Sequence, residues 1–165
     1  PSFKTVLTGD IALSEVIEQD YAPLFEAQHD EAAHYQAGGG RVCEDEAAYR
    51  DYLKKAADSG GIFRTILIEG KVAGYVASFD RFSKREISYW IGRAYWGQGI
   101  ASKAVALWLE AFALPAGGLF ARAAKDHPAS ARVLTKNGFV AFEDDTYYSD
   151  IRGEDVEEIL YRIGG

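Results

Sequence analysis

The sequence has only one cysteine, and this scarcity limits both its cross-links and its metal chemistry. Cys43 alone cannot form an intramolecular disulfide, and it cannot build a site that needs several cysteine ligands. We therefore expect a reduced, inert thiol and no bound metal ion.

Long hydrophobic runs are also missing. No stretch approaches the ~20 uninterrupted apolar residues that a membrane-spanning helix needs. The first residues, Pro1 to Thr5, lack the apolar centre of a secretory signal. The sequence therefore predicts a cytoplasmic protein that has no membrane partner.

Basic residues are fewer than acidic residues. The chain has 18 Lys and Arg against 25 Asp and Glu, which gives a net charge of -7. An acidic surface repels phosphate backbones, which argues against nucleic acid as a partner and favours a cationic one. Acidic residues crowd the C-terminal part, where they are balanced only by Arg152: Glu143, Asp144, Asp145, Asp150, Glu154, Asp155, Glu157 and Glu158. We interpret most of them as a solvated strand face.

The chain of 165 residues is long enough for one domain, over residues 1–165, at roughly 150 residues per domain. Apolar periodicity, glycines and prolines predict an α/β protein in which a mixed sheet is flanked by helices. Asp20 is expected to cap the first helix, and the strands 62–68 and 72–79 are expected to form an antiparallel hairpin. The expected strands are 11–17, 62–68, 72–79, 86–91, 119–124, 139–143 and 156–163, and the expected helices are 21–28, 44–57, 99–113 and 128–137.

The turn between the strand 86–91 and the helix 99–113 carries the strongest chemical signal. Gly97 and Gly99 allow backbone N–H groups to approach a ligand, and the following helix N-terminus adds partial positive charge, an arrangement that suits a pyrophosphate. The spacing argues against a nucleoside triphosphatase loop, because Gly99 is followed by Ile100 and not by Lys. A dinucleotide fingerprint is half matched by Gly97, Gly99 and Ser102, although Asp126 comes late for its acidic residue.

Three segments together resemble the GNAT acyl-CoA N-acyltransferase superfamily, and more narrowly its branch with ribosomal-protein N-terminal acetyltransferases. They are Glu-Ile-Ser-Tyr-Trp-Ile at 86–91, Trp-Gly-Gln-Gly-Ile-Ala at 96–101 and Pro-Ala-Ser-Ala-Arg-Val-Leu-Thr-Lys-Asn-Gly-Phe at 128–139. The resemblance extends from about residue 62 to 163. It implies a single-domain GNAT-like fold with a splayed, mostly antiparallel mixed sheet.

This resemblance implies that acyl-CoA lies in a V-shaped gap between the strand ending at Ile91 and the strand ending near Ala124. The backbone of Trp90 and Ile91 would pair with the pantetheine amides, and the amides from Gly97 to Ala101 would hold the pyrophosphate. The full set of implied acetyl-CoA-binding residues is Trp90, Ile91, Arg93, Trp96, Gly97, Gln98, Gly99, Ile100, Ala101, Ser102, His127 and Ser130.

The chain departs from the superfamily pattern at three positions. Ala94 stands where relatives often have Gln or Arg, and Arg93 is a candidate substitute. His127 replaces a common Asn and can alternatively be a helix cap. Leu134 stands where many relatives place a Tyr as general acid, which makes Ser130 the better proton donor to the departing thiolate.

An acidic residue often stands at the position of Glu86 in this branch, so we assign Glu86 as general base, directly or through water. The alternative for Glu86 is a solvent-facing residue paired with Lys84 or Arg85, and the alternative for Ser130 is a helix cap. Tyr147 and Tyr148 are the fallback candidates for proton transfer or acceptor contact.

We thus expect an acetyl-CoA-dependent N-acetyltransferase whose acceptor is a primary amine: a peptide N-terminus, a polyamine or an amino sugar. His29, His34 and Tyr35 lie in the region that shapes the acceptor mouth in the superfamily. Two alternatives stay open, namely a non-catalytic acyl-CoA-binding module and a transferase of a longer acyl group. The resemblance also allows a homodimer.

Overall fold

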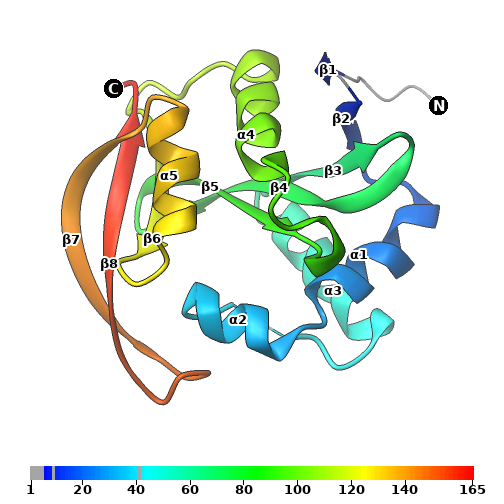
Figure 1. Cartoon of the computed structure of the whole chain (residues 1–165), viewed down its shortest axis with the longest axis horizontal. Coiled ribbons are helices and arrows are strands. Elements are labelled where there is room, and N and C mark those ends of the chain that lie inside the picture. Colours follow the sequence, from blue (N-terminus) through cyan, green and yellow to red (C-terminus); the bar gives the residue numbers. More distant parts are fainter. Residues whose placement is uncertain (1–5, 9, 41) are drawn as a thin grey trace.

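The computed structural model describes residues 6–8, 10–40 and 42–165, so the expectation for residues 1–5 lies outside it. These residues form an eight-stranded sheet in the order β1-β2-β3-β4-β5-β6-β8-β7 (Figure 1). Neighbouring strands are antiparallel except β5 and β6, which are parallel. The strands are β1 (Val6–Thr8), β2 (Ile11–Glu15), β3 (Ile62–Ile68), β4 (Lys71–Arg81), β5 (Lys84–Ile91), β6 (Leu119–Ala124), β7 (Val140–Ser149) and β8 (Glu154–Ile163).

Helices cover both faces of this sheet (Figure 1). On one face, α4 and α5 bury Val105, Leu107 and Leu134 against the strands. On the other face, α1 and α3 bury Leu24 and Leu53 in a second, smaller core. The helices are α1 (Tyr21–Gln28), α2 (Glu31–Ala37), α3 (Glu46–Asp58), α4 (Ile100–Ala111) and α5 (Pro128–Lys136), with short 3-10 turns η1 (Glu18–Asp20) and η2 (Arg93–Tyr95).

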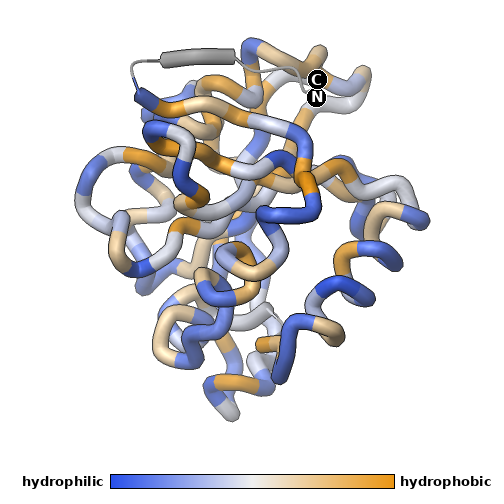
Figure 2. Tube along the Cα trace, turned by 90° about the vertical axis from the view of Figure 1, so that its right-hand side faces the viewer, coloured by the Kyte–Doolittle hydropathy of each residue, from blue (hydrophilic) through white to orange (hydrophobic). Residues whose placement is uncertain are grey.

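Hydrophobic and hydrophilic residues alternate over short distances along the trace (Figure 2). This alternation matches elements that are each buried on one side and solvated on the other. In the described residues, no helix has the length and apolar character needed to cross a membrane.

Local signals located most elements correctly. The β3–β4 hairpin is antiparallel, and Glu69 and Gly70 both adopt positive φ in its turn. Helix α5 begins at Pro128, and Gly138 follows its end with a φ of 90°. The expected splayed, mostly antiparallel sheet is therefore confirmed.

Two local predictions were wrong. Asp20 does not cap α1, because its buried carboxylate instead accepts hydrogen bonds from Ile17 N (3.0 Å) and Thr65 Oγ1 (2.8 Å). Helix α2 was missed, although it starts after Asp30, whose side chain accepts from Ala33 N. The segment with His34 and Tyr35 is thus a helix and not an irregular link.

The strands β5 and β6 form a fork. They pair at only one position, Glu86 with Phe120, although β5 continues to Ile91 and β6 to Ala124. Beyond that pair the two strands are no longer hydrogen-bonded, so a gap opens between them. The sheet therefore has the V-shaped opening that the family resemblance implies.

Candidate active site

The turn that leads from β5 into α4 presents a row of free backbone donors. Within the described ranges, none of the N–H groups from Gly97 to Ser102 donates a hydrogen bond to the protein, and no side chain caps α4. A helix N-terminus with unpaired N–H groups attracts anions, because the peptide dipoles add partial positive charge there. These donors can hold a pyrophosphate.

Two glycines give this turn its shape. Gly97 and Gly99 have φ of 78° and 73°, in the left-handed region that L side chains rarely adopt. A Cβ added to either glycine would meet nothing within 4 Å. Backbone conformation, and not crowding by the protein, is therefore the reason for glycine at both positions.

The free edge of β5 supplies further donors. Gly92 N donates a hydrogen bond to Ala73 O of β4. Along an antiparallel ladder, every second residue of a strand is hydrogen-bonded to the same neighbouring strand. By this alternation Trp90 also bonds to β4, whereas the N–H groups of Tyr89 and Ile91 point into the fork. A ligand strand in the gap would thus meet Tyr89 and Ile91, and the backbone of Trp90 faces away from it.

The side chains next to the turn attach it to α2. Arg93 donates to both carboxylate oxygens of Asp30 at 2.8 and 2.9 Å and lies 4.5 Å from the Trp96 ring centre. The Arg93 guanidinium holds the pKa of Asp30 below its usual range. Trp96 Nε1 donates to Ile91 O. The Arg93 guanidinium therefore links the turn to Asp30 at the start of α2.

Helices α4 and α5 are joined beside the donor row. Asn137 Nδ2 lies 3.1 Å from Ser102 O and 3.3 Å from Ser102 Oγ. His127 stands before α5 and makes no side-chain cap, and burial lowers the pKa of its imidazole. Asp126, the residue before it, is paired with Arg152. Neither residue caps the helix.

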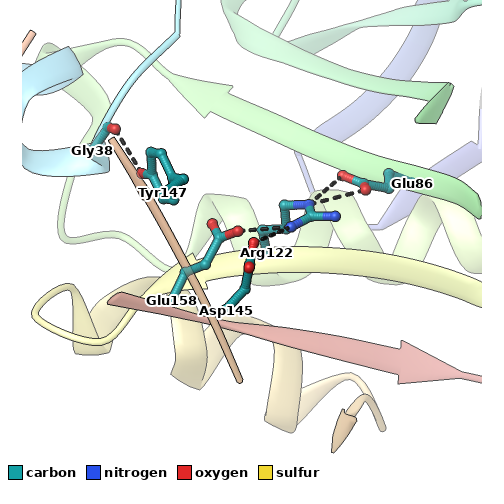
Figure 3. A network of polar contacts seen from close by, with 6 residues as sticks. All are labelled: Gly38, Glu86, Arg122, Asp145, Tyr147 and Glu158. Carbon is teal, nitrogen blue, oxygen red and sulfur yellow. Dashed lines mark hydrogen bonds and ion pairs between the residues drawn. The ribbon is translucent and has the colours of Figure 1, made fainter. Parts of the chain in front are cut away.

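Glu86 lies where the fork opens, and it is buried. Its side chain is 3% exposed, and both carboxylate oxygens accept from Arg122 Nε, at 3.0 and 3.2 Å (Figure 3). The alternative of a solvent-facing residue paired with Lys84 or Arg85 is wrong, since Arg85 instead reaches Ser78, Gly60 and Asp80.

Arg122 connects Glu86 to two residues that sequence reasoning did not single out. Arg122 Nη1 donates to Glu158 at 2.7 Å and to Asp145 at 3.3 Å, so that three carboxylates share one guanidinium (Figure 3). Burial raises the pKa of Glu158. The acidic C-terminal stretch is thus only partly a solvated face, because two of its members converge on the fork.

Ser130 faces the fork from α5. Its Oγ lies 2.9 Å from the hydroxyl of Tyr89, which also donates to Ser130 O. Burial raises the pKa of Tyr89 to about 12, so this phenol stays protonated at neutral pH. Tyr89 was not among the expected site residues, although its place two residues before Ile91 in the same strand could have indicated it.

Two of the remaining candidates, Tyr35 and Tyr147, lie on the side of the fork that α2 covers. Tyr147 donates to Gly38 O at 2.6 Å, and Arg152 donates to the carbonyls of Tyr35 and Gln36. These bonds tie α2 to β7 and to the β7–β8 connection. Tyr148 is exposed.

Both histidines in this region have structural partners. His34 is buried, stacks on Trp90 and lies near the carbonyls of Gln28 and Gly39, while His29 lies 3.0 Å from Cys43 O. In the part of the chain that the structure describes, no group of three or more His, Cys, Asp or Glu side chains is placed to hold a metal ion.

Comparison with known families gives a match to the family described as "Acetyltransferase (GNAT) domain" over residues 10–140. No curated protein sequence matches the chain. The resemblance found from the sequence motifs is therefore confirmed.

Solved structures share the fold over nearly the whole chain. RimL, a ribosomal L7/L12 alpha-N-protein acetyltransferase, has a TM-score of 0.80 at 16% identity, over 99% of this chain and 95% of that chain. A ribosomal-protein-S5-alanine acetyltransferase from Vibrio fischeri has a TM-score of 0.78 at 17% identity, over 97% and 96%. A spermidine N-acetyltransferase from Vibrio cholerae, solved with CoA and spermine, has a TM-score of 0.76 at 12% identity, over 94% and 96%. RimL has also been solved with coenzyme A.

Proposed function

Because the chain belongs to the GNAT acetyltransferase family, we propose that it transfers the acetyl group of acetyl-CoA to a primary amine, either a peptide N-terminus or a small cationic amine. The observation that carries this proposal is the row of unpartnered N–H groups from Gly97 to Ser102 beside the open β5–β6 fork. The row would hold the pyrophosphate, and the free edge at Tyr89 and Ile91 would pair with the pantetheine arm.

The acceptor class follows from charge and from the relatives. The fork is flanked by Glu86, Glu158 and Asp145 around one arginine, an arrangement that attracts an ammonium group. Proteins of this fold include acetyltransferases of ribosomal proteins and of spermidine. A primary amine on a peptide or on a small cation fits both observations.

The acceptor must lose a proton in the reaction. With a pKa of about 10.4, only about 1 in 2,500 lysine-like amines is neutral at pH 7. Glu86 is the proposed base, acting directly or through a water molecule. Glu158 is the second carboxylate on the same guanidinium, and burial raises its pKa, which makes it a stronger base than an ordinary carboxylate.

Acetyl-CoA supplies a thioester that is already reactive towards a neutral amine, so catalysis rests mainly on positioning. The amine nitrogen forms a bond to the acetyl carbon as the carbon–sulfur bond breaks. The base takes the proton of the amine and releases it to solvent. Ser130 gives its hydroxyl proton to the thiolate and takes a proton back from solvent. Of the two N–H groups on the free edge of β5, at Tyr89 and Ile91, the one that does not pair with the pantetheine arm polarises the thioester carbonyl.

Ligand binding and turnover test this proposal in two steps. Thermal shift with acetyl-CoA, longer acyl-CoAs and NAD identifies the ligand, and release of free CoA across a panel of amines then measures transfer. We expect acetyl-CoA to stabilise the protein and CoA release with at least one amine. Stabilisation by NAD alone would indicate a dinucleotide-binding protein, and stabilisation by acetyl-CoA without release from any amine would indicate a binding module.

Two variants separate the candidate bases. Glu86→Gln should lower kcat by about 100-fold or more and remove the rise of kcat with pH, while acetyl-CoA affinity stays unchanged. The same two measurements are made on Glu158→Gln. The control is Glu157→Gln, because Glu157 is the exposed neighbour of Glu158 on β8. If only Glu158→Gln flattens the pH profile, Glu158 is the base and the assignment of Glu86 fails.

A further inference from the structure

A cavity of about 250 Å³ lies between α3 and the sheet, on the face opposite α4 and α5. We call it the α3 pocket. Four of its lining side chains are aromatic: Tyr52, Phe63, Tyr75 and Phe79. The rest of the lining is formed by small side chains and one carboxylate: Ala56, Ser59, Ala77, Asp80 and Ser88. The walls are therefore mainly apolar and aromatic, as in pockets that bind small organic groups.

The α3 pocket lies directly beside the proposed base. In the β4–β5 ladder, Ser88 is opposite Ala77 and Glu86 is opposite Phe79. Residues two apart in a strand share a face and are about 6–7 Å apart, so Glu86 and Ser88 lie on the same face of β5. A molecule in the α3 pocket can thus reach Glu86 without crossing the sheet.

The two sides of this face differ in character. The α3 pocket is mainly aromatic, and its one carboxylate, Asp80, is paired with Arg85. On the far side of Glu86, two further carboxylates, Asp145 and Glu158, share the Arg122 guanidinium with Glu86. Charge complementarity assigns a cationic amine to the acidic side and an uncharged group to the pocket. Ser88 of the pocket and Glu86 are about 6–7 Å apart along β5, so a short chain can connect a group in the pocket to an amine at Glu86.

We propose that the α3 pocket binds an aromatic side group of the acceptor and so places the amine nitrogen of the acceptor at Glu86. This inference rests on the proposed acetyltransferase activity. The acceptor is then an arylalkylamine or a peptide with an aromatic residue at its N-terminus. The volume is sufficient, since an apolar cavity of about 150 Å³ in another protein accepts benzene. Aromatic walls also favour an aromatic guest through edge-to-face contacts.

Matched acceptors test the proposal at saturating acetyl-CoA. The probes are 2-phenylethylamine against ethylamine, and the peptide Phe-Gly-Gly against Ala-Gly-Gly. Transfer of a phenyl ring from water into the pocket should raise kcat/KM roughly 10- to 100-fold for the ring-bearing member of each pair. Equal kcat/KM values within both pairs would overturn the proposal.

A pocket-filling variant provides the structural control. Ala56→Phe should place a ring in the α3 pocket and abolish the preference for aromatic acceptors, with KM for acetyl-CoA unchanged. Ala57→Phe adds the same ring to the exposed next residue of α3, which does not line the pocket, and should keep the preference. If Ala56→Phe instead changes the preferred acyl-chain length, the pocket holds the acyl group and the proposal is wrong.

Failure of the proposed function can be told apart from failure of this inference. If no amine releases CoA, calorimetry of 2-phenylethylamine with the CoA-bound protein still reports on the pocket. Binding to wild type that is lost in Ala56→Phe supports the inference without turnover. Absence of binding, or equal binding to both proteins, overturns it.

Discussion

Replacement of Arg122 by methionine tests the charged network at the fork. The Arg122 side chain is 14% exposed and holds two carboxylates that are almost fully buried, those of Glu86 and Glu158. Methionine keeps much of the length of the side chain but removes the charge and the donors. The variant therefore leaves two buried carboxylates without their cation.

The expected loss of stability is large. Removal of one partner from a buried ion pair costs about 3–5 kcal/mol, because the remaining charge stays buried and unpaired. The matched control is Lys125→Met, just after β6, whose ion pairs with Asp144 and Glu157 are exposed. Exposed ion pairs contribute little to stability, because water and salt screen them, so the control should lose little.

The loss should depend on pH in a defined direction. Burial raises the pKa of Glu158 above its ordinary value, while Arg122 lowers it, so the Arg122→Met variant has a still higher pKa at this position. A carboxyl group whose pKa is raised on folding stabilises the folded state at low pH, and this contribution is lost as pH rises through the folded pKa. The deficit of the variant should thus be largest at pH 7.5 and smaller at pH 5.

Urea unfolding followed by circular dichroism at both pH values measures these free energies. A deficit no larger than that of Lys125→Met would refute the assignment of a buried, shared guanidinium. If the loss of unfolding free energy in Arg122→Met is the same at pH 5 and pH 7.5, the expected rise in the pKa of Glu158 in this variant is refuted.

Three further changes have defined outcomes. Gly99→Ala should weaken acetyl-CoA binding by calorimetry, because a left-handed φ costs an L residue about 1–2 kcal/mol and shifts the donor row; Gly60→Ala has the same kind of φ away from the site and should leave affinity intact. Ser130→Ala should lower kcat with little change in acetyl-CoA affinity, and Tyr89→Phe should lower it less; equal kcat to wild type in both would exclude this hydroxyl pair from proton transfer. Tyr49→Phe removes a buried hydroxyl with no hydrogen-bond partner among the described residues, and should leave the free energy of unfolding unchanged or raise it by about 1 kcal/mol.

Elements with local signals were predictable from the sequence. Helix α5 was located by Pro128 and Gly138, and the β3–β4 hairpin by a glycine between two apolar runs. The donor row was predictable for the same reason, since Gly97 and Gly99 are needed for a backbone conformation that neighbouring residues define. Helix α2 was not predicted, because its seven residues carry little apolar periodicity. The one local signal for this helix is its N-cap at Asp30.

Contacts between distant segments were not predictable in this way. Asp20 has the residue type of a helix cap, but its preferred donor is Thr65 of β3, which periodicity does not reveal. Glu158 resembles its acidic neighbours in sequence, and only the β6–β8 register places it beside Arg122. Burial of a charge depends on its partner, and the partner is set by tertiary structure.

The register of β5 determines which of its side chains lie on each face of the sheet at the site. Side chains alternate along a strand, so Glu86 shares the face of Ser88, which lines the α3 pocket, while Ile87 and Tyr89 face α4 and α5. A shift by one residue would exchange these sets and would also exchange the N–H groups that point into the fork. Gly74 holds the register, because a Cβ at this position of β4 would overlap the carbonyl oxygen of Trp90. One close backbone contact thus fixes which face holds the proposed base and which face holds the proposed proton donor.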